Sequence, residues 1–344
     1  MVQLQPYHST QQIVDFGLIP DDGYQTAAYC HVDSIHTGFT PMLLTYNSGT
    51  TKIAIPFLQR PIPESISKSN QYYDGISPYG YAGLISNTTV PQEILHALEE
   101  ANQFLRENHI VSLFLRMHPL HHQWQLPASA HIHHMQHGKV VYVDLRNDMA
   151  AIHANYSNNH KYDIRKLNRL GYTVRINDWT SYPDFIQSYY ETMQLHDASS
   201  MYFFPESYFT LLRNPELRIH LFTSHDPIGK FASGALFMAY GKTVQYHLGG
   251  TNPNYRQISP AKIIFESAFS HFKSLGHERF HLGGGYGSAE DNLYKFKARF
   301  SPSHSYFSTI RMICDPELYT TFSAPQLSDS EKHAVDFFPL YRAK

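Results

Sequence analysis

Cysteine is scarce in this sequence, which has two among its 344 residues, Cys30 and Cys314. Two distant thiols exclude a disulfide framework and a metal site of the CxxC type. Long hydrophobic runs are also missing, since no stretch approaches the roughly 18 to 20 apolar residues of a membrane span. The first residues lack the basic cluster and apolar run of a secretory signal. We therefore expect a cytoplasmic protein with no integral membrane segment.

An excess of charge of either sign is missing as well. Lys and Arg number 27 against 29 Asp and Glu, which gives a formal net charge of −2. This balance provides no global attraction to nucleic acid or to an anionic membrane, and we expect no DNA partner. Apolar residues make up 42% and charged residues 16%, as in a packed globular protein. The length exceeds the roughly 250 residues of a single core, so two domains are expected.

The same order of elements is predicted twice along the chain: a hairpin, a glycine-bearing strand, a helix started by proline, and a further strand. Pro91 and Pro260 are 169 positions apart in the sequence, and so are the predicted strand starts Ile110 and Arg279. Equal spacing of this kind indicates two copies of one architecture.

The second copy contains the most informative stretch. A strand at 243–248 runs into Gly249-Gly250, where the chain can bend or let a ligand approach the bare backbone, and a helix is predicted to begin with Ser259 as N-cap and Pro260 as its first residue. The next strand, 279–282, leads into three glycines. Beyond them, helical spacing places Leu293, Phe296 and Phe300 on one helical face, with the two phenylalanines buried and Lys297 beside them.

These motifs resemble the FemABX-type aminoacyl and acyl transferases. The resemblance rests on Tyr246-x-Leu-Gly-Gly, on Ser259-Pro260, on Phe280-His-Leu-Gly-Gly-Gly and on Leu293-x-x-Phe-Lys-x-x-Phe. It implies an α+β fold of two tandem GNAT-like domains, each a mixed β-sheet flanked by helices. We expect an N-terminal domain at 1–145, a C-terminal domain at 146–320, and a tail at 321–344 docked on the N-terminal domain.

The resemblance also implies an activity. It predicts transfer of an aminoacyl or acyl group onto an amino group of a cell-envelope precursor, by direct attack in a ternary complex. The expected partners are an acyl donor, aminoacyl-tRNA or acyl-CoA, and a nucleotide- or lipid-linked sugar acceptor; no cofactor is expected. A CoA-binding GNAT has a glycine-rich turn before its central helix, but the turn here, 255–261, has no glycine, which argues against ordinary CoA binding. A CoA-dependent N-acyltransferase of an amino sugar and a non-catalytic glycan or nucleotide-sugar binding module remain alternatives.

Three residues are candidates for catalysis. Lys297 can supply positive charge to an oxyanion or to a donor phosphate, although an exposed lysine beside a phenylalanine anchor would give the same pattern. Glu290 or Asp291 can accept a proton, and each can equally cap the following helix.

The remaining candidates would bind substrate. Lys161 and Arg165 lie in a basic helix that suits a diphosphate or a tRNA end, and a solvated helix face explains such a run equally well. His196 stands where the family usually has an arginine. The backbones of Gly249 and Gly284 can approach a ligand. The other candidates are Tyr202, Tyr246 and Arg256. Seven histidines at 118–137 lack acidic or cysteine partners at ligand spacing, so no metal site is predicted.

Overall fold

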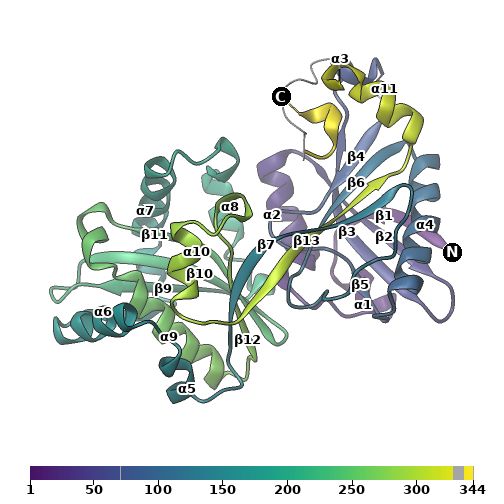
Figure 1. Cartoon of the computed structure of the whole chain (residues 1–344). Helices are drawn as coiled ribbons and strands as arrows, with labels where there is room; N and C mark the ends of the chain where they lie inside the picture. Colours follow the sequence, from purple (N-terminus) through teal and green to yellow (C-terminus); the bar gives the residue numbers. More distant parts are fainter. Residues whose placement is uncertain (70, 328–336, 344) are drawn as a thin grey trace. The chain divides into compact units, whose positions relative to one another are not determined.

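The computed structural model describes residues 1–69, 71–327 and 337–343 (Figure 1). Contacts divide the chain into two compact units. Unit 1 is formed by Met1–Pro20, Tyr24–His137 and Phe307–Lys344, and unit 2 by Asp21–Gly23 and Gly138–Tyr306. Among the described residues, no helix is long and apolar enough to cross a membrane.

This division differs from the sequence-based boundaries at 146 and 320. Unit 2 begins at Gly138, because strand β7 (Ile132–Asp144) pairs with β12 (Arg279–Gly283) through Val141 to Asp144. Residues 307–320, expected in the C-terminal domain, belong to unit 1, because β13 (His304–Ile313) pairs with β6 (Ile110–Met117). Part of the predicted tail, 328–336 and 344, lies outside the described residues. The tail's Tyr341 lies in unit 1, where its hydroxyl donates to Asp74 Oδ2 at 3.1 Å.

The sheet of unit 1 has the strand order β1-β2-β3-β4-β6-β13, with β5 paired to β3. Its pairs are antiparallel except β4 with β6, which run parallel. The elements not yet given are β1 Val2–Pro6, α1 Gln11–Asp15, α2 Ala27–Thr37, β2 Thr40–Asn47, β3 Lys52–Pro61, α3 Glu64–Ser67, β4 Tyr73–Ile76, β5 Ile85–Ser86, α4 Pro91–Glu107 and α11 Pro316–Leu327.

The core of unit 1 forms where α4 packs on this sheet. Ile94, Leu98 and Leu105 recur at helical spacing on one face of α4, and all three are fully buried against strand residues. The histidine-rich stretch makes structural contacts here. The ring of His134 accepts a hydrogen bond from the backbone of Leu126 at 3.2 Å, and burial is the first cause that lowers the pKa of His122 to about 3.

The sheet of unit 2 has the strand order β7-β12-β11-β10-β9-β8. The pair β11–β12 is parallel, and the pairs on either side of it are antiparallel. The remaining elements are α5 Met149–Ala154, α6 Asn158–Arg169, β8 Thr173–Ile176, α7 Tyr182–Leu195, α8 Glu206–Leu211, β9 Ile219–His225, β10 Phe231–Tyr240, β11 Thr243–Thr251, α9 Ala261–Ser274 and α10 Asn292–Ala298.

Helices cover both faces of the unit 2 sheet. In β10, Phe237 packs against Phe265 of α9, with ring centroids 6.0 Å apart. On the same strand, the Cα of Gly234 faces Phe185 of α7. Because successive residues of a strand point to opposite faces, α9 and α7 lie on opposite sides of the sheet. Every residue of β10 except Tyr240 is buried, as expected for a central strand covered on both faces.

Both units therefore contain a helix followed by a strand that runs parallel to an earlier strand of its sheet, which confirms the α+β class with two similar halves. Strands β6 and β12 begin at Ile110 and Arg279, as predicted. One detail of the prediction was wrong. Ser259 does not cap α9: it adopts a left-handed conformation with φ 53°, and Pro260 is the N-cap. Of the two alternatives at Gly249-Gly250, the chain does not bend there, because β11 continues through them in register with β10.

Candidate active site

Strands β11 and β12 are paired along only part of their length. The parallel pairing joins Thr243–Gln245 to Arg279–His281. Beyond it, β11 stays with β10 as far as Thr251, while Gly283 of β12 pairs with Val141 of β7. The two strands thus follow different neighbours, and a fork opens between them. We call this region the β11–β12 fork.

The backbone N–H of Gly249 lies on the edge of β11 that borders the fork. Asn252 donates its backbone N–H to the carbonyl of Ala232 in β10 at 3.0 Å, whereas Thr251 donates its N–H to the hydroxyl of Thr192 in α7 at 3.3 Å. Backbone groups of successive strand residues point alternately to the two edges, so Gly249 points the same way as Thr251, away from β10. A Cβ at Gly249 would collide with the Tyr246 hydroxyl, so glycine is required there.

Lys297 of α10 lies at the end of β12. Its ammonium donates to the carbonyl of Gly284 at 2.7 Å and lies 5.7 Å from the centre of the Tyr246 ring. Gly283 has φ +83°, and a Cβ there would come within 3.1 Å of Nζ. Lys297 is 7% exposed. Burial lowers the pKa of Lys297 to about 8, and the charge of Asp291 partly opposes this effect. The exposed lysine that the pattern also allowed is therefore excluded.

Two phenylalanines were predicted to anchor this helix. Phe300 is fully buried, with its ring 5.3 Å from that of Phe265. Phe296 is only partly buried, so that prediction was wrong, and Leu293, expected on the same helical face, is 46% exposed. Because α10 ends at Ala298, Phe300 lies beyond the helix, and its burial does not require Leu293 and Phe296 to be buried with it.

The two acidic candidates have different surroundings. Asp291 is the N-cap of α10: its oxygens accept the backbone N–H groups of Tyr294 at 2.8 Å and of Tyr286 at 3.0 Å. Burial acts to raise the pKa of Asp291, but these hydrogen bonds and the charge of Lys297 hold it below its ordinary value. Glu290 is exposed and pairs with Lys139 at 2.9 Å. Asp291 thus has the capping role that the sequence also allowed.

The structure brings together Tyr246, Gly249, Gly284, Asp291 and Lys297 at the fork. Burial raises the pKa of Tyr246 to about 12, so its hydroxyl stays protonated at neutral pH.

The other sequence candidates are held by contacts elsewhere in unit 2. Lys161 donates to the carbonyl of Ala154, and Arg165 donates to that of Lys161. The guanidinium of Arg256 lies 3.3 Å from the carbonyl of Glu191. His196 caps the end of α7 and is exposed, and the carbonyl of Tyr202 accepts the hydroxyl of Tyr189 at 2.6 Å.

Sequence reasoning missed a buried polar chain at the last paired residues of the fork. Nδ1 of His281 donates to Oε1 of Gln245 at 2.7 Å, and Nε2 of Gln245 donates to Asp22 at 2.8 Å. Gln245 and His281 are cross-strand partners. No local signal in the sequence links Gln245 to Asp22, which is more than 200 positions away.

A second missed residue supports the helix of Lys297. His160 of α6 is fully buried, and its Nε2 donates to the carbonyl of Phe296 at 3.1 Å. Its ring centre lies 4.4 Å from that of Phe300. Burial lowers the pKa of His160 to about 4, so the ring is neutral and rigidly placed. In the sequence, His160 stands at the start of the basic run, which hides this role.

Comparison with known proteins identifies the fold. Residues 154–297 match the family described as acetyltransferase (GNAT) domain. The structure is similar to that of FemX, with a TM-score of 0.69 and 12% identity over 92% of this chain and 99% of FemX. The chain has the fold of a Fem-like GNAT transferase.

Two further solved structures are similar to this one. The C-terminal domain of a putative lysylphosphatidylglycerol synthetase from Agrobacterium fabrum has a TM-score of 0.55 and 14% identity, over 93% of this chain and 95% of that domain. L-PGS from Bacillus licheniformis has a TM-score of 0.51 and 14% identity, over 92% and 96%. No curated protein matches the sequence. The family match, together with these neighbours, supports an acyltransferase.

Proposed function

We propose that this protein transfers an aminoacyl group from aminoacyl-tRNA to an amino group of a nucleotide- or lipid-linked cell-envelope precursor in the cytoplasm. The observation that carries the proposal is the Lys297 ammonium, buried at the β11–β12 fork and bonded to the Gly284 carbonyl. A desolvated cation beside an outward-facing strand amide suits a reaction that develops negative charge on oxygen. The similarity to FemX and to lysylphosphatidylglycerol synthetases supports the aminoacyl donor.

The proposed chemistry is a direct attack. The lone pair of the acceptor amine attacks the ester carbonyl carbon of the donor, and the carbonyl oxygen becomes an oxyanion. The Gly249 amide and Lys297 stabilise this charge, or Lys297 neutralises a donor phosphate. When the intermediate collapses, the carbon–oxygen bond to the tRNA ribose breaks. The amine loses a proton, and the departing ribose oxygen gains one.

The acidic residues have separate proposed roles. Both oxygens of Asp291 accept backbone N–H groups, which favours the carboxylate and makes this residue a poor proton acceptor at neutral pH. Asp291 instead positions α10 and partly offsets the charge of Lys297. Glu290, exposed beside the glycine loop, is the remaining candidate to receive the proton of the amine.

The N-terminus of α9 favours tRNA over CoA as the donor. A helix that binds pyrophosphate presents free amide groups at its first turn. Here Pro260 has no N–H, and the N–H of Lys262 is bonded to the carbonyl of Ser259 at 3.2 Å. Lys262 also forms a short ion pair with Asp163, which neutralises its ammonium. The match to an acetyltransferase domain favours the second candidate, a CoA-dependent N-acyltransferase of an amino sugar.

The test is a transfer assay with defined donors and acceptors. Purified protein is incubated with a mixture of radiolabelled aminoacyl-tRNAs or with labelled acetyl-CoA. The acceptors are a nucleotide-linked muramyl peptide, an amino sugar nucleotide and phosphatidylglycerol vesicles. Transfer from tRNA to the muramyl peptide, lost in Lys297→Met, supports the proposal. Transfer from acetyl-CoA alone promotes the second candidate, and transfer to the lipid hydroxyl refutes the amine acceptor.

A further inference from the structure

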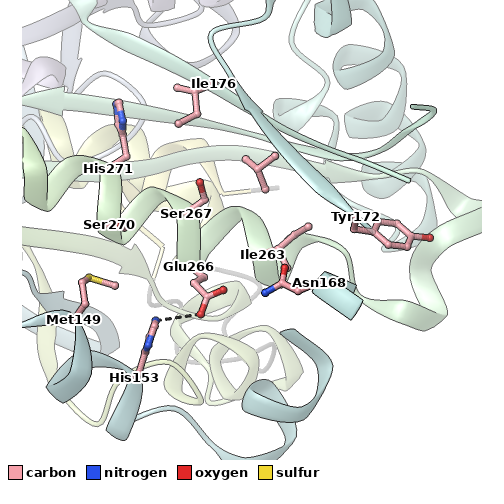
Figure 2. A pocket seen from close by; sticks show the side chains of 11 residues that line it. Met149, His153, Asn168, Tyr172, Ile176, Ile263, Glu266, Ser267, Ser270 and His271 are labelled. Carbon is pink, nitrogen blue, oxygen red and sulfur yellow. Dashed lines mark ion pairs between the residues drawn. The ribbon is translucent and has the colours of Figure 1, made fainter. Parts of the chain in front are cut away.

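A cavity of about 520 Å³ lies in unit 2 beside helix α9 (Figure 2). Its volume falls in the range of small-molecule binding sites. Eleven side chains line it, and they come from α5, the end of α6, the segment that joins α6 to β8, β8 itself and one face of α9. No function assigned above uses this cavity.

The cavity lies on a different face of α9 from the β11–β12 fork. The α9 residues that line it include Ile263, Glu266 and Ser270, which follow helical spacing along one stripe. A neighbouring stripe of α9, which faces the core, lies toward the fork. On this stripe Phe265 packs against Tyr246, with ring centroids 5.0 Å apart. None of the eleven lining residues belongs to the proposed transfer site, so a ligand in the cavity would leave the fork open.

The charge of the cavity is set by Glu266. Among the eleven lining side chains it is the one carboxylate, and none of them is Lys or Arg. Figure 2 shows its partner, His153, facing it from α5, with Nε2 and Oε1 3.1 Å apart. The two groups are close enough for an ion pair but are not aligned for a hydrogen bond. Burial raises the pKa of Glu266, and His153 opposes this effect. The carboxylate is thus partly desolvated and incompletely compensated.

Apolar and polar side chains both line the cavity beside this carboxylate. Ile263 lies one turn before Glu266 on α9, and Figure 2 places Met149 on its other side. Val174 of β8 adds a further apolar side chain. None of the lining side chains is a Lys or Arg that would bind an anion beside Glu266, and a purely apolar ligand would cover the carboxylate without giving it a hydrogen bond. A protonated amine on an apolar chain satisfies both surfaces.

We propose that this cavity is a binding site for a primary amine carried on an aliphatic chain. The ammonium pairs with Glu266, and the chain lies against Met149, Ile263 and Val174. The site does not depend on the transfer reaction proposed for the fork.

The test uses three probes of equal length: pentylamine, 1-pentanol and pentanoate. Binding to the full chain is followed by the NMR shifts of the Ser267 and Ser270 amides, with the Lys297 amide as the distant reference. We expect pentylamine to bind about tenfold or more tightly than pentanol, since a hydrogen bond to a charged group is worth more than a neutral one. Pentanoate should not bind. Equal binding of amine and alcohol, or shifts confined to Lys297, would overturn the proposal.

Two variants locate the charge. Glu266→Gln keeps the shape and should weaken pentylamine about tenfold or more, whereas the control Glu278→Gln, which breaks an ion pair with Lys242 elsewhere in unit 2, should not. His153→Arg retains Glu266 but supplies a permanent cation, so it should also abolish amine binding. Unchanged pentylamine affinity in Glu266→Gln or in His153→Arg would refute the site. Because the two variants change different side chains, one of them still tests the site if the other misfolds.

Discussion

Replacement of Lys297 by methionine removes a positive charge from the β11–β12 fork while keeping the length of the side chain. If the ammonium stabilises an oxyanion or a donor phosphate, the loss should be about 2 to 4 kcal/mol of transition-state energy, or roughly 30- to 1000-fold in rate. Stability should respond in the opposite sense. The pKa of about 8, against an ordinary 10.5, means that the folded protein disfavours the ammonium by about 3 kcal/mol. The variant should therefore melt no lower than the wild type at pH 7.

The assay measures single-turnover transfer and thermal melting on the same samples. Lys295→Met is the matched control, because Lys295 lies on the same helix but is exposed. The control should retain both rate and stability. A Lys297→Met protein that transfers at the wild-type rate would refute the catalytic role, and one that melts well below the wild type would refute the reasoning about desolvation.

Three further predictions concern pH, packing and the donor. A rate that needs the Lys297 charge should fall as pH rises through about 8. Between about 8 and 10.5 the unfolded lysine binds more protons than the folded one, so the free energy of unfolding should rise with pH there, and denaturant titrations of Lys297→Met should lack this rise. Phe300→Ala should cost about 3 to 5 kcal/mol in urea unfolding and Phe296→Ala clearly less, since only Phe300 is fully buried; equal losses would contradict the packing. Calorimetry should detect weak or no binding of acetyl-CoA, and a low micromolar dissociation constant displaced by free CoA would exclude tRNA as the preferred donor.

Local sequence signals predicted much of this structure. Pro91 and Pro260 marked the starts of α4 and α9, and strands were predicted at 243–248 and 279–282, where β11 and β12 form the fork. Lys297 could be placed against the glycine loop because both lie within 15 residues in sequence. One error arose where helical spacing was extended beyond its element, since the predicted face runs to Phe300 but α10 ends at Ala298. Contacts between distant segments, such as Lys139 with Glu290, have no local signal.

The fork itself is a consequence of sheet topology. Strand β11 remains paired with β10, and β12 turns to pair with β7, so the two parallel strands separate after Gln245 and His281. A cation buried at that separation is disfavoured in the free protein, which is what the lowered pKa of Lys297 reports. Negative charge that arrives with a donor, or that develops on its carbonyl oxygen, removes this penalty. In the proposed reaction, burial of the ammonium is therefore unfavourable in the free protein but not in the transition state. An interaction that is more favourable in the transition state than in the free protein raises the rate.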